Sequence, residues 1–455
     1  MKNVHNKIVT IFGAERSGIG AAKLLSHFGA KVLMSELDPF KFSEEKREIF
    51  KSINAEFEFG YHSPDVLKAD FCVLSPGMPS NAPILDKMRA KNIPIYSELE
   101  VASWFFDAPV IAISGSNGKT TTVNLIHHVL THLGFDSFLG GNVGTAISEI
   151  ILDSLKISTP KKIFVVEVSS FQLDYVSSFK PDVATLLNFS PDHLDRYDSE
   201  ESYYAAKLNL WKYLDNDSFA VINSDDDVLN HYSMPKQSKH LRFGKHKNRN
   251  DVFIQNNRMM AKIGDNAFEV LDLDRFTLPG EHNISNALAA VCSILPFSQD
   301  VMAMGTGLST FSPIPHRVEY SGNIKGIKFY NDSKATNIAS AKVAIQSFTN
   351  IWLILGGKDK GGDFAELISY LPKHVKQILL VGNAATTIAT QIGDDFPLVM
   401  CETIDKAIDY ALKNGVAGDT VLLSPACASF DQFSGYEARG DFFKNYVKEQ
   451  FVRDV

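Results

Sequence analysis

Short apolar runs alternate with amphipathic stretches along most of the chain. The runs are rich in β-branched residues and bounded by glycine, proline or an acid, which is typical of buried parallel strands. Between them, apolar residues recur at helical spacing, as from Val123 to Leu133, where Gly134 ends the pattern. The alternation predicts an α/β fold with strands at residues 7–12, 32–36, 71–77, 110–113, 163–168, 351–357, 377–382 and 420–425.

The predicted strands and helices fall into three regions, and a chain of 455 residues is long enough for two to four domains. No low-complexity linker separates the regions, so we place boundaries near residues 100 and 313. We predict a Rossmann-like N-terminal domain over 1–100, a central P-loop ATPase-type α/β domain over 101–313, and a Rossmann-like C-terminal domain over 314–455.

A glycine-rich loop joins the strand predicted at 110–113 to the helix that follows it. Two glycines let successive backbone N–H groups face one concavity, which suits phosphate oxygens at a helix start. Lys119 adds a charge for the terminal phosphates, and the Thr120 hydroxyl is placed to ligate Mg²⁺. The spacing is shorter than in the general P-loop motif, because Ile113 stands where an early glycine is usual. The loop predicts nucleoside triphosphate binding by Gly115, Ser116, Asn117, Gly118, Lys119, Thr120 and Thr121.

Two further acids stand at the ends of predicted strands. Glu167 closes an apolar run, where an acid without a partner is costly, and a P-loop site needs an acid on a neighbouring strand to hold its metal. Glu36 lies near the distance at which dinucleotide-binding folds hold a ribose. However, Glu15 replaces the middle glycine of the dinucleotide-binding motif, which argues against a nicotinamide cofactor.

The amino-acid composition indicates which partners and which cellular compartment to expect. The net charge of -8 gives no electrostatic reason to expect nucleic acid as the main partner. No apolar run approaches the length of a membrane span, and the start of the chain lacks the apolar core of a secretion signal. The four cysteines lie far apart without a Cys-x-x-Cys pair. We therefore expect a cytoplasmic protein without membrane insertion.

Seven further motifs, taken with the phosphate loop, make the chain similar to a known family. They are Glu167–Gln172, Asp192–Arg196, Tyr204–Lys207, His282–Ala287, Pro315–Glu319, Asn331–Asn337 and Ser424–Phe433. Together they resemble the Mur ligases, ATP-dependent amide ligases that build the peptide of bacterial cell-wall precursors. The last two most resemble the member that adds D-glutamate to UDP-N-acetylmuramoyl-L-alanine. The Asp-Asn-Pro-Arg signature of the member that adds meso-diaminopimelate is absent from the sequence.

The resemblance implies a reaction through an acyl phosphate. ATP would phosphorylate the acceptor carboxylate, with Lys119 on the phosphates and with release of ADP and phosphate. It further implies two magnesium sites, the first held by Thr120 and Glu167 and the second by His193. A lysine at position 207 of a predicted amphipathic helix is normally solvated. The resemblance implies instead that CO₂ carbamylates Lys207, which turns a cation into an anion that supports magnesium.

The resemblance also implies binding residues for each substrate, in a protein that we expect to be a monomer. The third domain would close around ATP before the reaction. For the rest of ATP the implied residues are Asn283, Asn286, Arg317 and Asp332. For the UDP-linked acceptor they are Arg16, Ser17, Glu36, Gly77, Asn142, Ser169 and His193. For D-glutamate they are Lys334, Thr336, Lys360, Ser429 and Tyr436. The family's usual acid at the end of the second strand falls on Ser35, so either Ser35 or Glu36 is a candidate to contact uracil.

Other functions fit parts of the sequence. A nucleotide-driven regulator or transport ATPase would need the phosphate loop but no amino-acid site. A nicotinamide-dependent oxidoreductase would need the first region alone, and Glu15 argues against it. Within the ligases, a folate enzyme that adds polyglutamate is the nearest competitor. Hydrolysis of ATP with a UDP-linked acceptor, scanned across L- and D-amino acids, separates these hypotheses.

Overall fold

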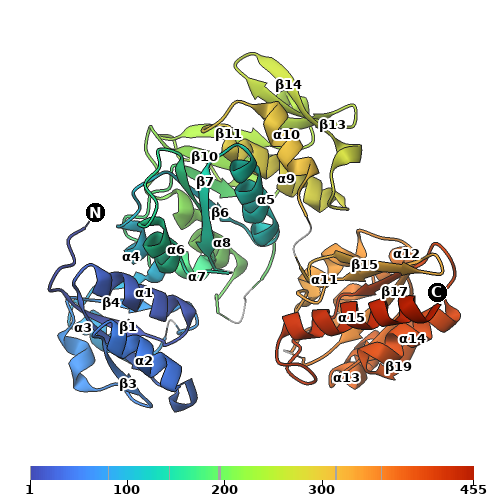
Figure 1. Ribbon diagram of the computed structural model, residues 1–455, viewed down its shortest axis with the longest axis horizontal. Coiled ribbons are helices and arrows are strands. Elements are labelled where there is room, and N and C mark those ends of the chain that lie inside the picture. The colour runs from blue at the N-terminus through green and yellow to red at the C-terminus, as the bar shows by residue number, and fades with distance from the viewer. Residues whose placement is uncertain are drawn as a thin grey trace. The chain divides into compact units, whose positions relative to one another are not determined.

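The computed structural model describes residues 2–41, 43–79, 81–142, 144–192, 196–312, 315–359 and 361–454, and Figure 1 shows their helices and strands. The chain forms two compact units. One consists of Met1–Phe276 with Ser285–Thr310, and the other of Thr277–Ile284 with Phe311–Val455. The first unit contains two sheets and the second unit contains one.

The first sheet is parallel throughout, with strand order β3-β2-β1-β4-β5. Its strands are β1 (Ile8–Phe12), β2 (Lys31–Glu36), β3 (Glu56–Phe59), β4 (Phe71–Leu74) and β5 (Ile95–Ser97). Its helices are α1 (Arg16–His27), α2 (Glu44–Ser52), α3 (Pro83–Ala90) and α4 (Glu98–Ser103). The order reverses at β1, between β2 and β4, and open α/β sheets bind ligands at such a point. Gly18 lets α1 approach the loop after β1, because a Cβ there would overlap the Gly13 carbonyl oxygen.

The central sheet has strand order β14-β13-β12-β11-β10-β9-β6-β8-β7. Its strands are β6 (Val110–Ser114), β7 (Asp136–Gly141), β8 (Lys162–Glu167), β9 (Val183–Leu186), β10 (Phe219–Asn223), β11 (Lys239–Phe243), β12 (Val252–Gln255), β13 (Arg258–Ile263) and β14 (Asn266–Asp272). Its helices are α5 (Lys119–His132), α6 (Ile147–Ser154), α7 (Ser170–Leu173), α8 (Glu200–Leu208), α9 (Glu281–Ile294) and α10 (Val301–Ser309). Strand β6 lies between β8 and β9, so the loop that follows it has a strand end on either side.

The third sheet has strand order β15-β16-β20-β17-β18-β19. Its strands are β15 (Glu319–Ile324), β16 (Ile327–Asn331), β17 (Ile351–Gly356), β18 (Val375–Val381), β19 (Leu398–Glu402) and β20 (Thr420–Leu423). Its helices are α11 (Ile338–Ile345), α12 (Leu371–His374), α13 (Ala385–Ile392), α14 (Ile404–Asn414) and α15 (Tyr436–Asp454). Alternate strand residues face opposite sides. Leu353 and Leu380 pack with α11 and α13, whereas Ile354 and Leu379 pack with α14 and α15.

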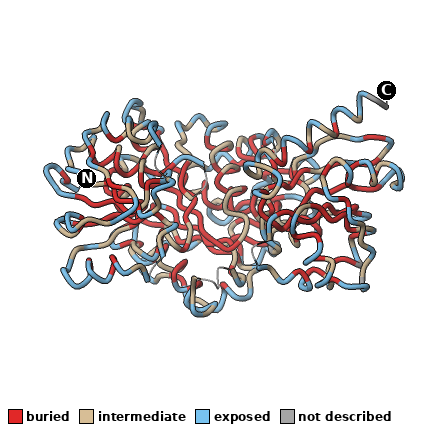
Figure 2. The backbone as a smooth tube through the Cα atoms, turned by 90° about the horizontal axis from the view of Figure 1, so that it is seen from below, coloured by how far each residue is buried: buried red, intermediate tan, exposed pale blue. Residues whose placement is uncertain are grey.

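The strands of each sheet form the most buried part of the chain. Within each unit, Figure 2 shows buried backbone through the interior and exposed backbone in the outer loops. Strand β6, for example, is buried at all positions from Val110 to Ser114. Such continuous burial explains why the strands read as unbroken apolar runs rather than as alternating ones.

Antiparallel hairpins extend two of the sheets, which the sequence analysis did not predict. Asn256 and Asn257 have φ of 50° and 59° and form the two-residue turn between β12 and β13. Lys325 and Gly326, with φ of 53° and 81°, do the same between β15 and β16. Positive φ at both central residues is the signature of the turn that matches strand twist. The predicted strands themselves are observed, with ends within a few residues of the prediction.

A buried carboxylate links α4 of the first sheet to the segment that precedes β9 of the central sheet. Glu100 of α4 accepts hydrogen bonds from the Trp104 ring and from backbone N–H groups of Ser177, Ser178 and Phe179, at 2.9–3.0 Å. Burial opposes ionisation of this side chain, but the donors outweigh it and the pKa of Glu100 lies below its ordinary value. Glu100 therefore fixes α4 against the segment Ser177–Phe179, which precedes β9.

Two simple exclusions follow for the parts of the chain that the structure covers. Among those residues, no helix combines the length and the apolar character needed to cross a bilayer. The four cysteines are all buried and none forms a disulfide. Burial raises the pKa of Cys72 to about 12, so this thiol stays protonated.

Candidate active site

The loop after β6 has the geometry of a phosphate cradle. Gly115 and Gly118 have φ of 149° and 85°, values that favour glycine, and Gly118 is the N-cap of α5. A Cβ at Gly118 would also overlap the Asn286 side-chain oxygen, so α9 packs against the start of α5. The positive end of the dipole of a fourteen-residue helix therefore lies directly after the loop. This arrangement is the one predicted for phosphate binding.

The segment after β9 holds this loop in place. The Ser116 N–H donates to the Asn188 carbonyl at 3.0 Å, and the Asn117 N–H donates to the Asn188 side chain at 2.8 Å. The Ser116 hydroxyl donates to the Ser190 carbonyl at 2.9 Å. The sequence analysis did not single out Asn188 or Ser190. The sequence signal that could have identified them is their position just after a buried strand. The carboxyl ends of neighbouring parallel strands meet at one edge of the sheet, so these residues lie near the phosphate loop.

Two lysines converge on one backbone carbonyl of the loop. The Lys119 Nζ donates to Gly115 O at 2.7 Å and to Ser116 O at 2.8 Å. The Lys207 Nζ, from α8, donates to the same Gly115 O at 2.9 Å. Lys207 is 1% exposed and its Nζ lies 4.5 Å from the centre of the Tyr203 ring. The usual expectation for a lysine on an amphipathic helix, a solvated side chain, is therefore wrong at this position.

The surroundings of Lys207 favour its neutral amine. Burial is the main cause and the charge of Lys119 the second, and together they lower the pKa of Lys207 well below its ordinary value. The carboxylates of Asp192 and Glu167 act in the opposite direction without cancelling this effect. A neutral amine is the nucleophilic form of lysine, and it is the form that adds CO₂.

Glu167 ends β8 beside the loop, in register with Ile113 of β6. Its side chain is 2% exposed, and Oε1 accepts a hydrogen bond from the Asn142 side chain at 3.1 Å. Its other oxygen, Oε2, is buried and has no hydrogen-bond partner within the described chain. A buried carboxylate oxygen without a donor is costly, unless a cation binds it. This oxygen fits a metal ligand.

The residues predicted to hold magnesium are brought together only in part. Thr120 lies at the start of α5, beside the loop that Lys207 contacts, and its hydroxyl makes no hydrogen bond with another described residue. His193, the residue predicted for the second metal, lies outside the described residues. In the ranges that are described, no three His, Cys, Asp or Glu side chains form a metal-binding group. An oxygen ligand set of Glu167 and Thr120 suits a hard cation such as Mg²⁺.

A cleft of about 1020 Å³ opens at the point where the strand order of the first sheet reverses. Among the predicted acceptor-binding residues, its lining includes Arg16, Ser17, Glu36, Gly77 and Asn142. Arg16 donates to the Asn142 carbonyl at 2.6 Å, and Asn142 contacts Glu167, so the cleft reaches the phosphate-loop region. Ser169 does not line this cleft and instead caps α7 through Gln172.

The acid at the end of β2 has a local structural role. Glu36 accepts from the Ala14 N–H and the Asp38 N–H, each at 3.0 Å, and pairs with Lys41 at 3.4 Å. Burial opposes its ionisation, yet these donors outweigh burial and lower the pKa of Glu36. Both of its oxygens are thus in use within the protein, and its predicted contact with substrate stays a prediction.

The remaining residues predicted for ATP lie at two places. Asn286 accepts from the Thr122 hydroxyl at 3.3 Å within the first unit. In the second unit, the Asn283 amide donates to Pro279 O at 2.7 Å. Asp332 accepts from the Ser424 hydroxyl at 2.8 Å, and burial raises its pKa to about 7 although Arg317 acts against this. The Nε of Arg317 is buried and has no hydrogen-bond partner among the described residues.

The residues predicted for the amino acid lie on loops at one edge of the third sheet. Lys334 and Thr336 follow β16, and Ser429 follows β20, which pairs with β16. Tyr436 begins α15, and the Lys334 Nζ lies 5.7 Å from the centre of its ring. Lys360 lies outside the described residues. Lys334, Thr336 and Ser429 thus lie on loops at one edge of the sheet, and their contact with the amino acid stays a prediction.

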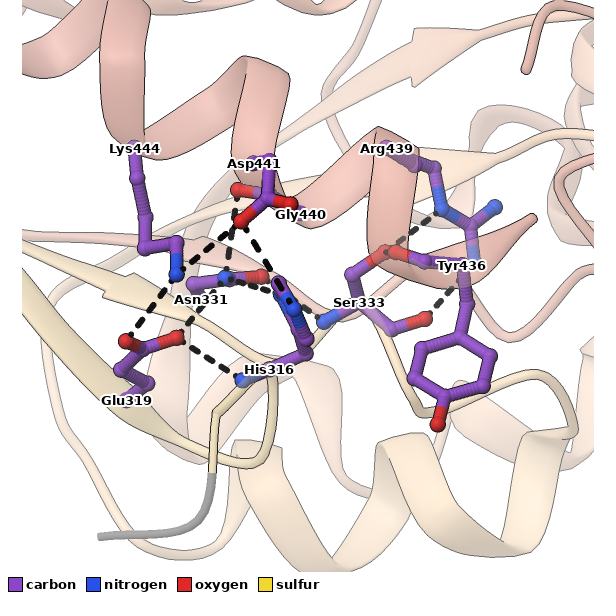
Figure 3. Close-up of polar contacts among 9 residues, drawn as sticks. All are labelled: His316, Glu319, Asn331, Ser333, Tyr436, Arg439, Gly440, Asp441 and Lys444. Atoms are coloured by element: carbon purple, nitrogen blue, oxygen red, sulfur yellow. Dashed lines mark hydrogen bonds and ion pairs between the residues drawn. The ribbon is translucent and has the colours of Figure 1, made fainter. Parts of the chain in front are cut away.

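A buried arginine, not predicted from the sequence, ties these loops together, and Figure 3 shows it beside Ser333. Arg439 of α15 donates to the Ser333 hydroxyl at 2.9 Å and to the Ser333 carbonyl at 2.8 Å. It also donates to the carbonyls of Cys427 and Ala428, at 3.1 and 3.2 Å. Burial lowers its pKa to about 10, so the guanidinium stays charged at neutral pH. Arg439 fixes the loop after β16 against the loop after β20.

A second polar cluster in Figure 3 holds the start of the third sheet. Glu319 accepts from the His316 N–H at 2.8 Å, the Asn331 amide at 3.2 Å and the Lys444 ammonium at 3.2 Å. His316 and Val318 have φ of 63° and 48°, and Val318 is an outlier because β-branched residues rarely adopt positive φ. The cluster therefore holds a strained segment on both sides of Arg317.

Replacing Arg439 by alanine is expected to lower the free energy of opening of β16 and β20 by roughly 3–5 kcal/mol, because several buried carbonyls lose their donor. Hydrogen exchange of the backbone amides of these strands in the full-length protein measures this. Lys448→Ala, on the exposed side of the same helix, is the matched control. It should change the free energy of opening by less than about 0.5 kcal/mol. Equal protection in both variants would contradict the role of Arg439.

Comparison with known proteins matches two family models to the chain. The Mur ligase middle domain matches residues 113–294, and the Mur ligase, glutamate ligase domain matches residues 316–427. A protein of Chloroherpeton thalassium named UDP-N-acetylmuramoylalanine–D-glutamate ligase is 34% identical, over 98% of this chain and 99% of that protein. A protein of the same name from Elusimicrobium minutum is 37% identical, over 97% and 98%. The chain belongs to the Mur ligase family.

Solved structures agree with the fold of this Mur ligase. A MurF ligase from Thermotoga maritima, determined in complex with ADP, has a TM-score of 0.61 at 18% identity and covers 99% of this chain and 100% of its own. A UDP-N-acetylmuramate-alanine ligase from the same organism has a TM-score of 0.58 at 18% identity, covering 98% and 100%. The predicted α/β class, with sheets in three successive regions, is confirmed, as is the predicted family.

Proposed function

We propose that this Mur ligase uses ATP to join D-glutamate to UDP-N-acetylmuramoyl-L-alanine. The observation that supports this most is the arrangement at Gly115, where two lysines meet beside a buried acid with one oxygen unpartnered. It places the Lys119 ammonium and an unpartnered carboxylate oxygen beside the phosphate loop, as phosphoryl transfer with a bound cation requires. The choice of substrates rests on relatives that are 34–37% identical over nearly the full chain and carry that name. We further propose a cytoplasmic monomer with domains over 1–100, 101–313 and 314–455.

The reaction divides into two steps. A carboxylate oxygen of the acceptor attacks the γ-phosphorus of ATP, the bond to the bridging oxygen breaks, and ADP leaves. The resulting acyl phosphate is then attacked by the amine of D-glutamate at the acyl carbon. The C–O bond to phosphate breaks, phosphate leaves with the electron pair, and the nitrogen loses a proton to give the amide. No protein nucleophile is required, so catalysis rests on placement and charge.

Residues of the first unit would carry out the first step. Lys119 would turn from the loop carbonyls toward the phosphates, and the N–H groups at the start of α5 would bind them. Glu167 and Thr120 would hold one Mg²⁺, which neutralises phosphate charge when bound. His193 is proposed for a second metal. Carbamylation would turn Lys207 into an anion that supports the magnesium, and its neutral amine makes that addition chemically accessible.

The other substrate contacts are proposals on the same basis. Asn283, Asn286, Arg317 and Asp332 would bind ATP, together with the loop Gly115–Thr121. Arg16, Ser17, Glu36, Gly77, Asn142, Ser169 and His193 would bind the acceptor. Lys334, Thr336, Lys360, Ser429 and Tyr436 would bind D-glutamate, a dianion at its carboxylates that needs cationic and hydroxyl donors.

The deciding experiment follows phosphate release by the purified protein with ATP and UDP-N-acetylmuramoyl-L-alanine, across L- and D-amino acids. We expect release to depend on both the acceptor and D-glutamate. Faster ligation of L-alanine, L-lysine or meso-diaminopimelate would contradict the amino-acid assignment while leaving the ATP chemistry intact. Release that needs no amino acid would favour a regulator or a transport ATPase.

Lys334 provides a sharper test of the amino-acid site. Lys334→Met should raise the KM for D-glutamate by about tenfold or more, because one charge-assisted hydrogen bond contributes roughly 1.5–3 kcal/mol. The KM for ATP should change by less than about threefold. Lys328→Met, at an exposed position of the neighbouring strand β16, is the matched control and should change neither. A parallel rise of both KM values would contradict a specific role of Lys334 in binding D-glutamate.

A further inference from the structure

Three polar side chains meet at the edge of the first sheet. Ser35 lies near the end of β2, Glu58 lies on β3, and His62 follows β3 in the loop. The Ser35 Oγ lies 2.5 Å from Glu58 Oε1 and 2.6 Å from His62 Nδ1. Ser35 and Glu58 are buried, with 0% and 8% of their surface exposed. Neither Glu58 nor His62 was singled out in the sequence.

The chemistry of these groups fixes where the protons lie. A carboxylate can only accept, and Glu58 Oε1 already accepts from the Ser63 N–H at 3.0 Å. The Ser35 hydroxyl must therefore donate its one proton to Glu58. Its oxygen then has only lone pairs to offer, so His62 donates from Nδ1. In a neutral imidazole the other nitrogen, Nε2, is consequently an acceptor.

The environment keeps the His62 ring neutral and fixes its plane. Burial lowers the pKa of His62 in spite of the nearby carboxylates of Glu58 and Glu36. The ring meets the Phe12 ring edge to face, with 5.1 Å between centres and an interplanar angle of 84°. Within the described chain, Nε2 has no hydrogen-bond partner. Ser35 and His62 both line the cleft of about 1020 Å³.

The register of the strands places Ser35 and Glu58, the two partners of His62, beside the end of β1. Leu74, Phe12, Ser35 and Glu58 stand side by side across neighbouring strands. Adjacent strands lie about 4.8 Å apart, so the group around Ser35 lies roughly 5–10 Å from the end of β1. The loop after β1 leads into α1, whose start suits a diphosphate. The reactive end of the proposed acceptor would extend toward Asn142, which also lines the cleft and donates to Glu167.

We propose that His62, held as its Nδ1–H tautomer by Ser35 and Glu58, selects the uracil ring by accepting its N3–H at Nε2. This inference rests on the proposed UDP-linked acceptor. Uracil carries a proton on N3, whereas cytosine carries a lone pair there, which would face the lone pair of His62. His62 is thus a residue that determines base specificity, and Ser35 and Glu58 are positioning residues that set its tautomer.

The test measures the affinity of the full-length protein for UDP and for CDP by calorimetry, without ATP or amino acid. We expect the wild type to prefer UDP by roughly ten- to hundredfold, the discrimination that one well-placed polar contact to a base provides. His62→Leu should lose most of that preference, chiefly through weaker UDP binding. Tyr61→Ala, at the exposed neighbouring position, is the matched control and should keep the preference.

A second measurement separates positioning from folding. The ¹⁵N chemical shifts of the His62 ring should report the Nδ1–H tautomer in the wild type and a mixture in Ser35→Ala and Glu58→Gln. Those two variants should also show a smaller preference for UDP, although His62 is still present. A purely structural role would instead lower UDP and CDP affinity in parallel and leave their ratio unchanged.

The outcomes distinguish this inference from the proposed function. A wild-type protein that binds neither nucleotide would contradict the UDP-linked acceptor itself. Equal affinity for UDP and CDP in the wild type, or an unchanged preference in His62→Leu, would overturn the role of His62 and leave the ligase assignment standing. Loss of preference in His62→Leu together with retention in Tyr61→Ala supports the inference.

Discussion

Replacing Glu167 by alanine is expected to lower kcat by at least about a hundredfold while the protein stays folded, since metal clamps contribute several kcal/mol. The reason lies in its two oxygens. One is held by Asn142, whereas Oε2 is buried without a partner among the described residues, which suits a cation. Removing a buried carboxylate that lacks a full set of donors also relieves a desolvation cost, so the free energy of unfolding should change by less than about 1 kcal/mol. Steady-state kinetics and urea unfolding measure the two effects.

Glu98 offers a matched control for this experiment. It too is a buried glutamate with one unpartnered oxygen, but it packs against Ser148 between α4 and α6. Glu98→Gln should therefore keep kcat within about threefold of the wild type. Retention of more than about a tenth of the activity by Glu167→Ala would remove Glu167 from the metal site.

Replacing Lys207 by alanine is expected to abolish turnover to a similar extent, about a hundredfold or more. In the proposed mechanism the carbamate, not the amine, supports the magnesium. Short carboxylic acids such as formate or acetate should then restore part of the activity, because they return the missing anion to the cavity. Burial, which lowers the pKa of Lys207, favours the uncharged amine that this addition needs.

Two controls separate the carbamate from the ammonium. Lys207→Arg keeps the positive charge and cannot be carbamylated, so it should be as inactive as the alanine variant and should not respond to carboxylic acids. Removing CO₂ from the buffer should lower wild-type activity, and bicarbonate should restore it. Normal activity of Lys207→Ala in CO₂-free buffer, or its rescue by ammonium instead of carboxylates, would end this interpretation.

The strands, the phosphate loop and the family could be predicted because their signals are local. The apolar run 110–113, the two glycines of the loop and the threonines after Lys119 lie within about a dozen neighbouring positions. Burial on both faces makes such strands continuous in sequence. The same reasoning missed the hairpins, where Asn256-Asn257 was the available turn signal.

The supporting residues of the site depend on distant pairing and could not be predicted in the same way. Arg439 contacts residues more than a hundred positions away, and its helix pattern alone describes an ordinary surface arginine. Asn188 and Glu58 acquire their roles from the register of strands that are separated in sequence. Lys207 is buried because α8 packs its last turn on the phosphate loop. A single sequence contains no direct record of such pairings.

The two tight glycines have a consequence for resistance to inhibitors. At Gly18 an added side chain would overlap the Gly13 carbonyl, and at Gly118 it would overlap Asn286 in a backbone conformation that favours glycine. A compound that gains its affinity from the main chain at these two turns would therefore contact positions where escape mutations disrupt the protein itself. Compounds that rely on exposed side chains, such as Leu37 in the cleft of the first sheet, would meet no such restriction.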